Sequence, residues 1–435
     1  MKILDFLSEG LGVYLTPAVL LLSAFVLLPH IPLRRLLGPV TFFRTLRDRP
    51  DDARTSPAAS LSLALAGTLG VGNITGVTSA LLSGGPGAVF WMWTGAVVSI
   101  VVKYAEVFLA VKFRREDRRG KYGGAMYYIR DGLRLSGNRS VICGGIFAVL
   151  CCVNSLVTGN IVQANAAACI FPERYRLTCG FLLAAALTAS IFYGRQRMEK
   201  ITSRLMPPLT AAYMLLSGTV LVKNAALLPE IFSDILRCAF APRAFLGGTA
   251  GFTLREALRC GVMRGIFSNE SGCGTSPTAH AAADTKSPHH QACFGVVEVV
   301  FDTLILCTMT ASVLLCADRG TFPLPWKTDA DASAVTLGAF RALAGDAAYV
   351  VLCISVVLFA YAAIAAQITY GTAALGYLTK KKLPLLLYFA ASAVCTVAGA
   401  VIASPLMWTM ADIVLGTMTV INCTVLILLR RSLRD

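Results

Sequence analysis

Charged residues are scarce in this 435-residue sequence, and acidic residues are the scarcer sign. Charged residues make up 14% of the chain, compared with about 25% in soluble globular proteins. Asp and Glu number 24 against 39 Lys and Arg, and 56% of the residues are hydrophobic. This balance excludes an ordinary soluble domain. The excess positive charge lies in short loops between apolar runs, not in one basic patch, so we expect no nucleic-acid partner.

Histidine is rare, and the cysteines lack the spacing that metal sites use. The sequence has four histidines and fourteen cysteines, without metal-ligand spacing or a CxxC pair. We therefore expect buried apolar thiols and no metal centre of His or Cys. Ser268, Glu270 and His280 share one segment, but several helical turns separate His280 from the other two. Without a nucleophile and base within reach of each other, we expect no enzyme.

Long apolar runs dominate the sequence and predict an all-α polytopic membrane protein. Each run is close to or longer than the roughly twenty residues that a bilayer requires. The first run has no basic segment before it and no small-residue cleavage site after it, so we interpret it as a retained helix, not a signal peptide. The eleven predicted spans are approximately 12–31, 57–82, 86–112, 142–170, 176–194, 203–222, 255–283, 291–317, 346–378, 383–403 and 405–429.

Basic residues fall in alternate loops and predict the orientation of the chain in a cell membrane. They gather at 34–54, 112–121, 195–204, 380–382 and 430–434. The intervening loops "SGGPG" and "ASPL" carry no charge. By the positive-inside rule, the basic loops and the C-terminus are cytoplasmic and the N-terminus is outside. The expected surroundings are membrane lipid.

Two spans contain stretches that are poor in helix formers. "GTLGVGNITGV" occupies 67–77 and "GIFSNESGCGTSPTAH" occupies 265–280. Spans two to six and seven to eleven have opposite orientation, and each set of five begins with one of these stretches. An inverted repeat whose sets open on a broken helix is typical of secondary transporters. The predicted units are an extra helix and basic loop at 1–55, a first repeat at 56–222 broken at 70–76, an extracellular loop at 223–250, and a second repeat at 251–435 broken at 267–275.

The residues in the two breaks suit a small charged ligand. Free N–H groups of an unwound helix bind a carboxylate, whereas free carbonyls bind a cation. Asn73 adds an amide with both donor and acceptor groups. In the second break, polar side chains stand together in the run Ser268, Asn269, Glu270 and Ser271. The alternative is that the glycines only permit close helix packing.

Several motifs together resemble the alanine or glycine:cation symporter family, within the LeuT-type architecture. They are "LAGTLGVGNITGVTSALLSGGPGAVFWMW", "KYAEVFLAVKFR", "GGAMYYI", "GNIVQAN", "RGIFSNESGCGTSPTAHAAA" and "DTLILCTMT", in that order between about Ser56 and Leu378. The resemblance implies a LeuT-type five-plus-five inverted repeat with one extra N-terminal helix. It also implies a transporter that moves small neutral amino acids, such as alanine or glycine, with sodium.

The resemblance implies a ligand site at the backbone of 70–73 with Gln163 and Phe267, and the polar residues of the spans complete the candidates. The substrate-binding residues would be Gly70, Val71, Gly72, Asn73, Gln163, Phe267, Ser268, Asn269 and Gln367. The candidates for cation coupling would be Gly67, Asn73, Glu270, Asp302 and Thr303. Glu270 and Asp302 either fix the broken helix or carry charge that is linked to transport. We expect a monomer.

Three departures from the family pattern concern coupling. Val71 replaces the usual threonine, and Ala362 with Ala363 replaces a Ser-Thr pair that completes a sodium site in LeuT-type transporters. Gln367 replaces the usual tryptophan, which predicts a roomier and more polar pocket. We therefore expect at most a weak sodium site, with Na⁺ or H⁺ as the possible coupling ion. The alternatives are a facilitated or proton-coupled carrier, or a ligand-binding membrane sensor that has lost coupling.

Lys103 and Glu106 are three residues apart on one helix face, a spacing at which the two side chains could pair. The sequence places them towards the cytoplasmic end of a span, where a lysine can reach the interface. We therefore predict a structural or gating role for both residues, without contact to the ligand.

Overall fold

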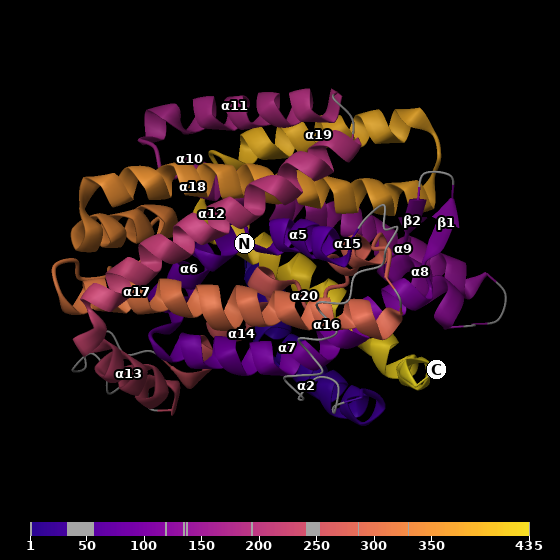
Figure 1. Ribbon diagram of the computed structural model, residues 1–435, viewed down its shortest axis with the longest axis horizontal. Coiled ribbons are helices and arrows are strands. Elements are labelled where there is room, and N and C mark those ends of the chain that lie inside the picture. The colour runs from indigo at the N-terminus through magenta and orange to yellow at the C-terminus, as the bar shows by residue number, and fades with distance from the viewer. Residues whose placement is uncertain are drawn as a thin grey trace.

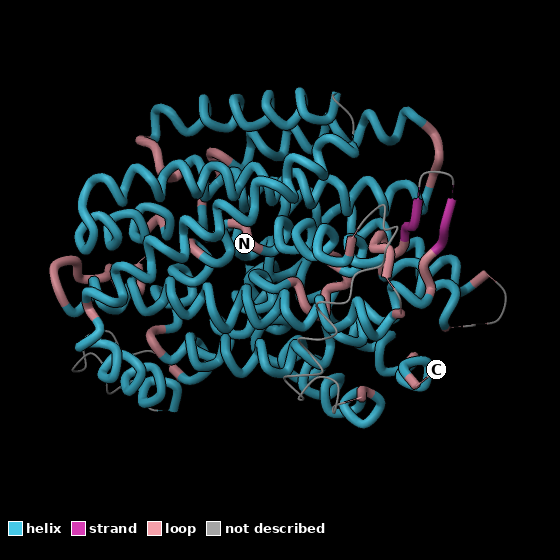
Figure 2. The backbone as a smooth tube through the Cα atoms, viewed as in Figure 1, coloured by secondary structure: helices cyan, strands magenta, loops and turns pink. Residues whose placement is uncertain are grey.

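The protein is almost entirely helical (Figures 1 and 2). The computed structural model describes residues 2–32, 56–117, 120–133, 135, 138–192, 195–240, 253–285, 287–328 and 330–434. Within these ranges, nine helices are long and apolar enough to cross a membrane, and one bent pair brings the number to ten. The predicted basic segment 34–54 and Arg118 and Arg119 lie outside the described residues.

The helices follow the predicted spans closely. The N-terminal span consists of α1 (Lys2–Glu9), a π-helical segment (Gly10–Leu15) and α2 (Thr16–Leu27). The next helices are α5 (Pro57–Thr68), α6 (Thr75–Gly84), α7 (Gly87–Lys112), α8 (Ala125–Gly132), α9 (Arg139–Asn154), α10 (Val162–Ala168), α11 (Glu173–Phe192), α12 (Arg195–Lys223) and α13 (Leu228–Phe240). The C-terminal half comprises α14 (Leu254–Asn269), α15 (Pro277–Ala281), α16 (Pro288–Val299), α17 (Thr308–Arg319), α18 (Ala332–Leu378), α19 (Lys382–Gly399) and α20 (Ser404–Leu428).

Local chemistry explains where several helices begin. Ser56 accepts a hydrogen bond from the Ala59 N–H and precedes Pro57 at the first helical position of α5. Thr253 and Glu256 form a capping box at the start of α14, in which each side chain accepts the other residue's N–H. Such caps satisfy N–H groups that have no partner within the helix.

The bundle has a buried centre and exposed edges. Most of the helices run along the long axis of the molecule, and α11 and α19 lie together along one edge (Figure 1). The most apolar window of α7 is 67% buried, whereas that of α19 is only 22% buried. The edge helices therefore expose apolar side chains, as a helix in contact with lipid does.

A small antiparallel hairpin lies at one end of the bundle. Its strands β1 (Arg115–Asp117) and β2 (Gly120–Tyr122) pair Arg115 with Tyr122 and Asp117 with Gly120. The hairpin lies beside α8 and at the same end of the molecule as the C-terminus (Figure 1). Lys112 Nζ ties this end together by donating to the Ser432 carbonyl at 2.9 Å.

The helix α18 begins earlier than predicted, at Ala332 instead of residue 346. Gly345 has φ 81°, so the chain kinks there between an outer segment and the predicted span. The outer segment is anchored to the first half of the protein, because the Thr336 hydroxyl lies 2.6 Å from that of Thr78. Ser333 also donates to the Ala166 carbonyl at 2.9 Å.

Candidate functional site

The first predicted break is present at residues 69–74. The helix α5 ends at Thr68, a single 3₁₀ turn spans Val71–Asn73, and α6 starts at Thr75. The two arms meet at an angle of 58°. The break therefore lies slightly earlier in the chain than the predicted 70–76, because Thr75 and Gly76 already belong to α6.

Three side chains from distant parts of the chain hold the first break. Gln163 of α10 accepts a hydrogen bond from the Val71 N–H at 3.0 Å through its Oε1 atom. The Asn73 amide donates to Asp302, at 2.7 Å to Oδ1 and 3.0 Å to the backbone carbonyl. Thr310 donates to the Asn73 carbonyl at 2.7 Å. The unwound backbone is thus fixed by hydrogen bonds that a helix would have provided internally.

The second break begins three residues later than predicted. Phe267, Ser268 and Asn269 still belong to α14, because the Glu270 N–H continues the helical ladder to the Ile266 carbonyl at 2.8 Å. The helix ends where Glu270 takes a left-handed conformation with φ 50°. Two left-handed glycines, at 272 and 274, follow before α15. Their positive φ angles are ones that glycine adopts without steric cost.

Asp302 connects the two breaks. It lies in a π-helical segment (Val300–Cys307) between α16 and α17. One carboxylate oxygen accepts from Asn73 of the first break, and the other accepts from Ser268 beside the second break at 2.5 Å. Thr303 donates to the same carboxylate and accepts from the Asn269 amide at 3.0 Å. Five predicted site residues therefore belong to one buried network.

The remaining predicted residues surround this network. Glu270 accepts from Thr275 at 2.5 Å and from the Gln367 amide. Phe267 lies against Gly72, where an added Cβ atom would meet the ring at 3.0 Å. A Cβ atom on Gly67 would lie 2.8 Å from the Tyr370 hydroxyl of α18, so this glycine packs against a different neighbour.

Three buried oxygens in this region have no hydrogen-bond partner among the residues that the structure describes: Asn73 Oδ1, Gln367 Oε1 and the Ser271 hydroxyl. The first two are amide oxygens, which only accept hydrogen bonds. A buried polar atom without a partner costs about 1–3 kcal/mol. These two acceptors are therefore available to a ligand that carries donor hydrogens.

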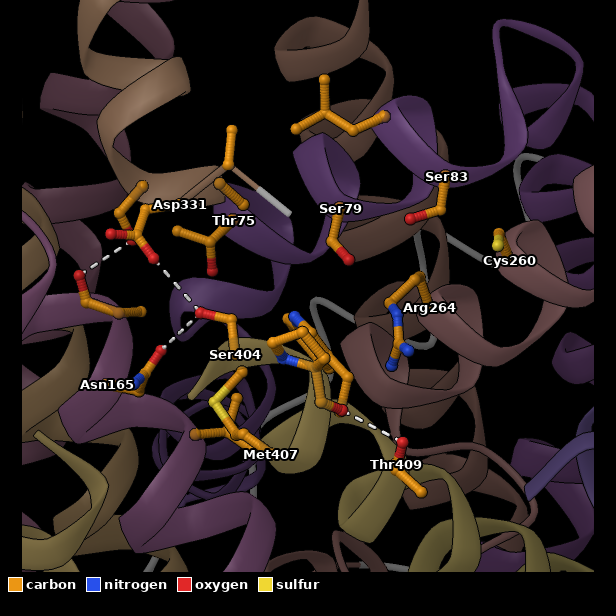
Figure 3. A pocket seen from close by; sticks show the side chains of 18 of the residues that line it. Thr75, Ser79, Ser83, Asn165, Cys260, Arg264, Asp331, Ser404, Met407 and Thr409 are labelled. Carbon is orange, nitrogen blue, oxygen red and sulfur yellow. Dashed lines mark hydrogen bonds between the residues drawn. The ribbon is translucent and has the colours of Figure 1, made fainter. Parts of the chain in front are cut away.

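A cavity of about 210 Å³ lies next to the predicted site (Figure 3). Its walls come from α6, α10, α14, α20 and the segment before α18. None of the predicted substrate residues lines it; Gly70 and Asn73 line a separate hollow of about 10 Å³. In this conformation the space for a ligand lies beside the first break, not within it.

An ion pair and two aromatic rings connect this cavity with the first break. Arg264 donates to both Asp412 oxygens, at 2.8 and 3.1 Å. Its guanidinium lies 4.0 Å from the centre of the Trp408 ring. Trp408 in turn meets the Phe267 ring edge-on at 5.1 Å. The sequence did not predict Arg264, Trp408 or Asp412 as site residues. An ionisable residue inside a span is a functional candidate by itself, so Arg264 and Asp412 could have been identified on that ground.

Lys103 and Glu106 do not behave as predicted. Both side chains are fully buried, so Lys103 does not reach the interface. Its ion pair is with Glu298 of α16 at 3.3 Å, and Glu106 instead accepts from backbone N–H groups of the second break. The reason is that α7 packs against both α14 and α16, which brings partners that the sequence spacing does not reveal.

Comparison with known proteins decides the family. A model of the sodium:alanine symporter family matches residues 4–434. The chain belongs to this family. It is 34% identical to the sodium/alanine symporter AgcS of Methanococcus maripaludis, over 97% of this chain and 90% of that protein. It is 31% identical to the uncharacterized transporter YflA of Bacillus subtilis, over 99% and 89% of the two chains. The probable sodium/glutamine symporter GlnT of Bacillus subtilis is 32% identical over 86% of this chain and 76% of its own length.

Membership of the sodium:alanine symporter family confirms the family resemblance that the motifs indicated. The family consists of transporters, and the similar proteins are named as symporters and amino-acid carriers. A multi-pass membrane protein with about nine spanning helices agrees with this class.

Proposed function

We propose that this protein is a secondary active transporter that moves small neutral amino acids across the cell membrane by alternating access. The observation that carries the proposal is the carboxylate of Asp302, which accepts hydrogen bonds from Asn73 in the first break and from Ser268 at the end of α14, beside the second break. A site built on two broken helices couples the two halves of a transporter through one ligand. The extracellular and cytoplasmic sides would reach this site in turn.

The proposed architecture is a LeuT-type inverted repeat with eleven spans. The eleventh span would be α14 with α15, since α14 alone has 16 residues. Packing between corresponding helices of the two sets of five supports the repeat. The second members α7 and α16 pack together, as do the third members α9 and α18 and the fourth members α11 and α19. A two-fold relation between the sets produces such like-with-like contacts.

The proposed substrate is a zwitterion held between the breaks. Its carboxylate would bind N–H groups of residues 70–73, and its ammonium would bind the unpartnered oxygens Asn73 Oδ1 and Gln367 Oε1. Phe267 and Gly72 would limit the side chain of the ligand, because the ring lies directly against the glycine. Relatives are named for alanine and for glutamine, and the polar Gln367 supports a substrate from this neutral class.

We propose that sodium dependence is weak. Ala363 packs against Gly70 of the first break, where an added Cβ atom would lie 2.9 Å from its methyl group. A hydroxyl at this position would offer sodium an oxygen, and a methyl group offers none. An ion drives transport only through different affinities for the conformational states. Glu270 and Asp302 are the proposed proton carriers if an ion is used.

Uptake of labelled amino acids into proteoliposomes tests the function and its coupling. We expect uptake of L-alanine or another small neutral amino acid, with little change when a sodium gradient is imposed at fixed pH. The double variant Ala362→Ser/Ala363→Thr should then increase the dependence on sodium. Absence of uptake across a panel of neutral amino acids would contradict the function. Steep sodium activation of the wild type would contradict only the coupling proposal.

A further inference from the structure

We infer that Lys103 and Glu106 of α7 are positioning residues that clamp the second break with opposite charges. This inference rests on the proposed transport function, because the clamped segment includes three proposed ligand residues: Ser268, Asn269 and Glu270. Neither side chain contacts the proposed substrate position directly. They act by fixing the backbone that carries these ligands.

Lys103 supplies a resident cation at the end of α14. Its Nζ atom donates to the Asn269 carbonyl at 2.8 Å, to the Ser276 hydroxyl at 2.5 Å and to Glu298 at 3.3 Å. The C-terminal end of a helix carries a partial negative charge on its free carbonyls, which a cation stabilises. The ammonium is therefore placed where a half-helix would otherwise attract a mobile cation. It joins the end of α14 to Ser276, on the far side of the break.

Glu106 binds the part of the same break that presents N–H groups. Its two carboxylate oxygens accept from the Gly274 N–H at 2.9 Å and the Gly272 N–H at 3.1 Å. Successive N–H groups that point inward from a turn of this kind form an anion-binding concavity. Asn422 of α20 closes the arrangement by donating to Glu106 at 2.6 Å and to the Gly272 carbonyl at 2.8 Å.

One face of α7 thus matches the polarity of the second break at two places, the end of α14 and the turn at residues 272–274. Lys103 and Glu106 are three residues apart, so both point from α7 towards the same neighbour. The cation meets the Asn269 carbonyl and the Ser276 hydroxyl, and the anion meets two backbone N–H groups. Glu298, the ion-pair partner of Lys103, is itself held in place by His280. The two side chains lie 2.9 Å apart, and the other ring nitrogen of His280 lies 2.8 Å from the Gln291 amide. Each charge therefore has the sign that the backbone groups facing it require.

The first test neutralises the cationic half of the clamp together with Glu298, its ion-pair partner. In Lys103→Met/Glu298→Gln both members of the ion pair become neutral, which avoids the penalty of an unpaired carboxylate. We expect this variant to fold with its half-saturation concentration for L-alanine raised by about tenfold or more, because a charge-assisted hydrogen bond to the site backbone is lost. Glu106→Gln should have a similar effect, since its amide cannot accept at both oxygen positions. Lys112→Met is the matched control on the same helix and should leave L-alanine uptake unchanged.

The second test asks whether charge at this position is what matters. Lys103→Ala should recover uptake in the presence of methylammonium, which replaces the missing ammonium, but not with equal concentrations of uncharged methanol. A residue that only fills space would not respond to charge in this way. Wild-type affinity in Lys103→Met/Glu298→Gln, or equal effects of methylammonium and methanol on Lys103→Ala, would overturn the inference.

Hydrogen–deuterium exchange separates failure of this inference from failure of the proposed function. The peptide that covers residues 268–276 should exchange faster in Glu106→Gln and in Lys103→Met/Glu298→Gln than in the wild type or Lys112→Met. This measurement needs no substrate. Unchanged exchange in both clamp variants would overturn the inference even if the wild type transports L-alanine, whereas absence of uptake by the wild type would contradict only the function.

Discussion

Gly70 in the first break and Gly76 in the first turn of α6 differ in the space around them. A Cβ atom on Gly70 would lie 2.6 Å from Gln163 Oε1, whereas one on Gly76 would meet its nearest neighbour, Phe267, at 3.7 Å. Gly70→Ala should therefore push Gln163 away from the Val71 N–H and weaken L-alanine binding by about tenfold, the cost of one buried hydrogen bond. Gly76→Ala should bind L-alanine almost as the wild type does. The half-saturation concentration for L-alanine uptake measures the effect of each variant. A Gly76→Ala variant that is as impaired as Gly70→Ala would contradict the assigned contacts.

The motifs identified some residues of the site and not others. Asn73, Ser268 and Asp302 are linked by hydrogen bonds, and all three could be named from the sequence. The partners of Lys103 could not be named, because spacing along one helix says nothing about which other helix packs on that face. For the same reason the ion pair between Arg264 and Asp412 joins two spans that are about 150 residues apart in sequence, and neither motif spacing nor hydropathy predicts it.

At the scale of elements, Gly345 determines the shape of α18. Its φ of 81° and ψ of −176° belong to a region that is essentially restricted to glycine. Among the described residues, no neighbouring atom lies within 4 Å of an added Cβ atom at Gly345 or at Gly376 of the same helix. Gly345→Ala should therefore destabilise the protein by about 1–3 kcal/mol through backbone strain alone. Gly376→Ala, in regular helix, should be neutral or stabilising by up to about 1 kcal/mol.

Thermal unfolding of the purified protein checks this pair. The melting temperature should fall for Gly345→Ala and should stay level or rise for Gly376→Ala. Equal melting temperatures would show that the kink is not required. The kink also separates the span that hydropathy located at 346–378 from the helical segment 332–344 before it, which the sequence did not predict.

The sequence predicted which segments are helical better than it predicted the residues at which the helices end. The two breaks show the physical reason. Glycine and asparagine mark where a helix is weak, but packing decides where it ends. Phe267 remains helical because its ring is held between Gly72 and Trp408. The chain leaves the helix at Glu270, where the left-handed turn lies against Lys103 and Glu106. Those contacts come from α7, more than 160 residues earlier in the chain.

At the scale of the whole molecule, the distribution of charge defines two ends. The hairpin, α8 and the C-terminus lie together at one end, and α13 lies towards the other (Figure 1). The hairpin end carries ion pairs of Arg115 and Arg130 with Asp131, and of Lys121 with Asp284. The positive-inside rule predicts that this end is cytoplasmic. The cavity, which Ser83, Asp331 and Thr409 help to line, would then face the outside.

Labelling of intact cells with a membrane-impermeant maleimide tests this orientation and the side to which the cavity opens. Cys169 and Cys260 also line the cavity, so the variants are made in a Cys169→Ser/Cys260→Ser background. Ser83→Cys and Thr409→Cys should react from outside the cell, and Lys381→Cys should react only after the membrane is permeabilised. L-alanine should slow labelling of Thr409→Cys if the cavity is the outer half of the transport path, because substrate changes the populations of the conformational states. Labelling of Lys381→Cys in intact cells would reverse the orientation, and the five-plus-five assignment would then lose the charge pattern on which it depends.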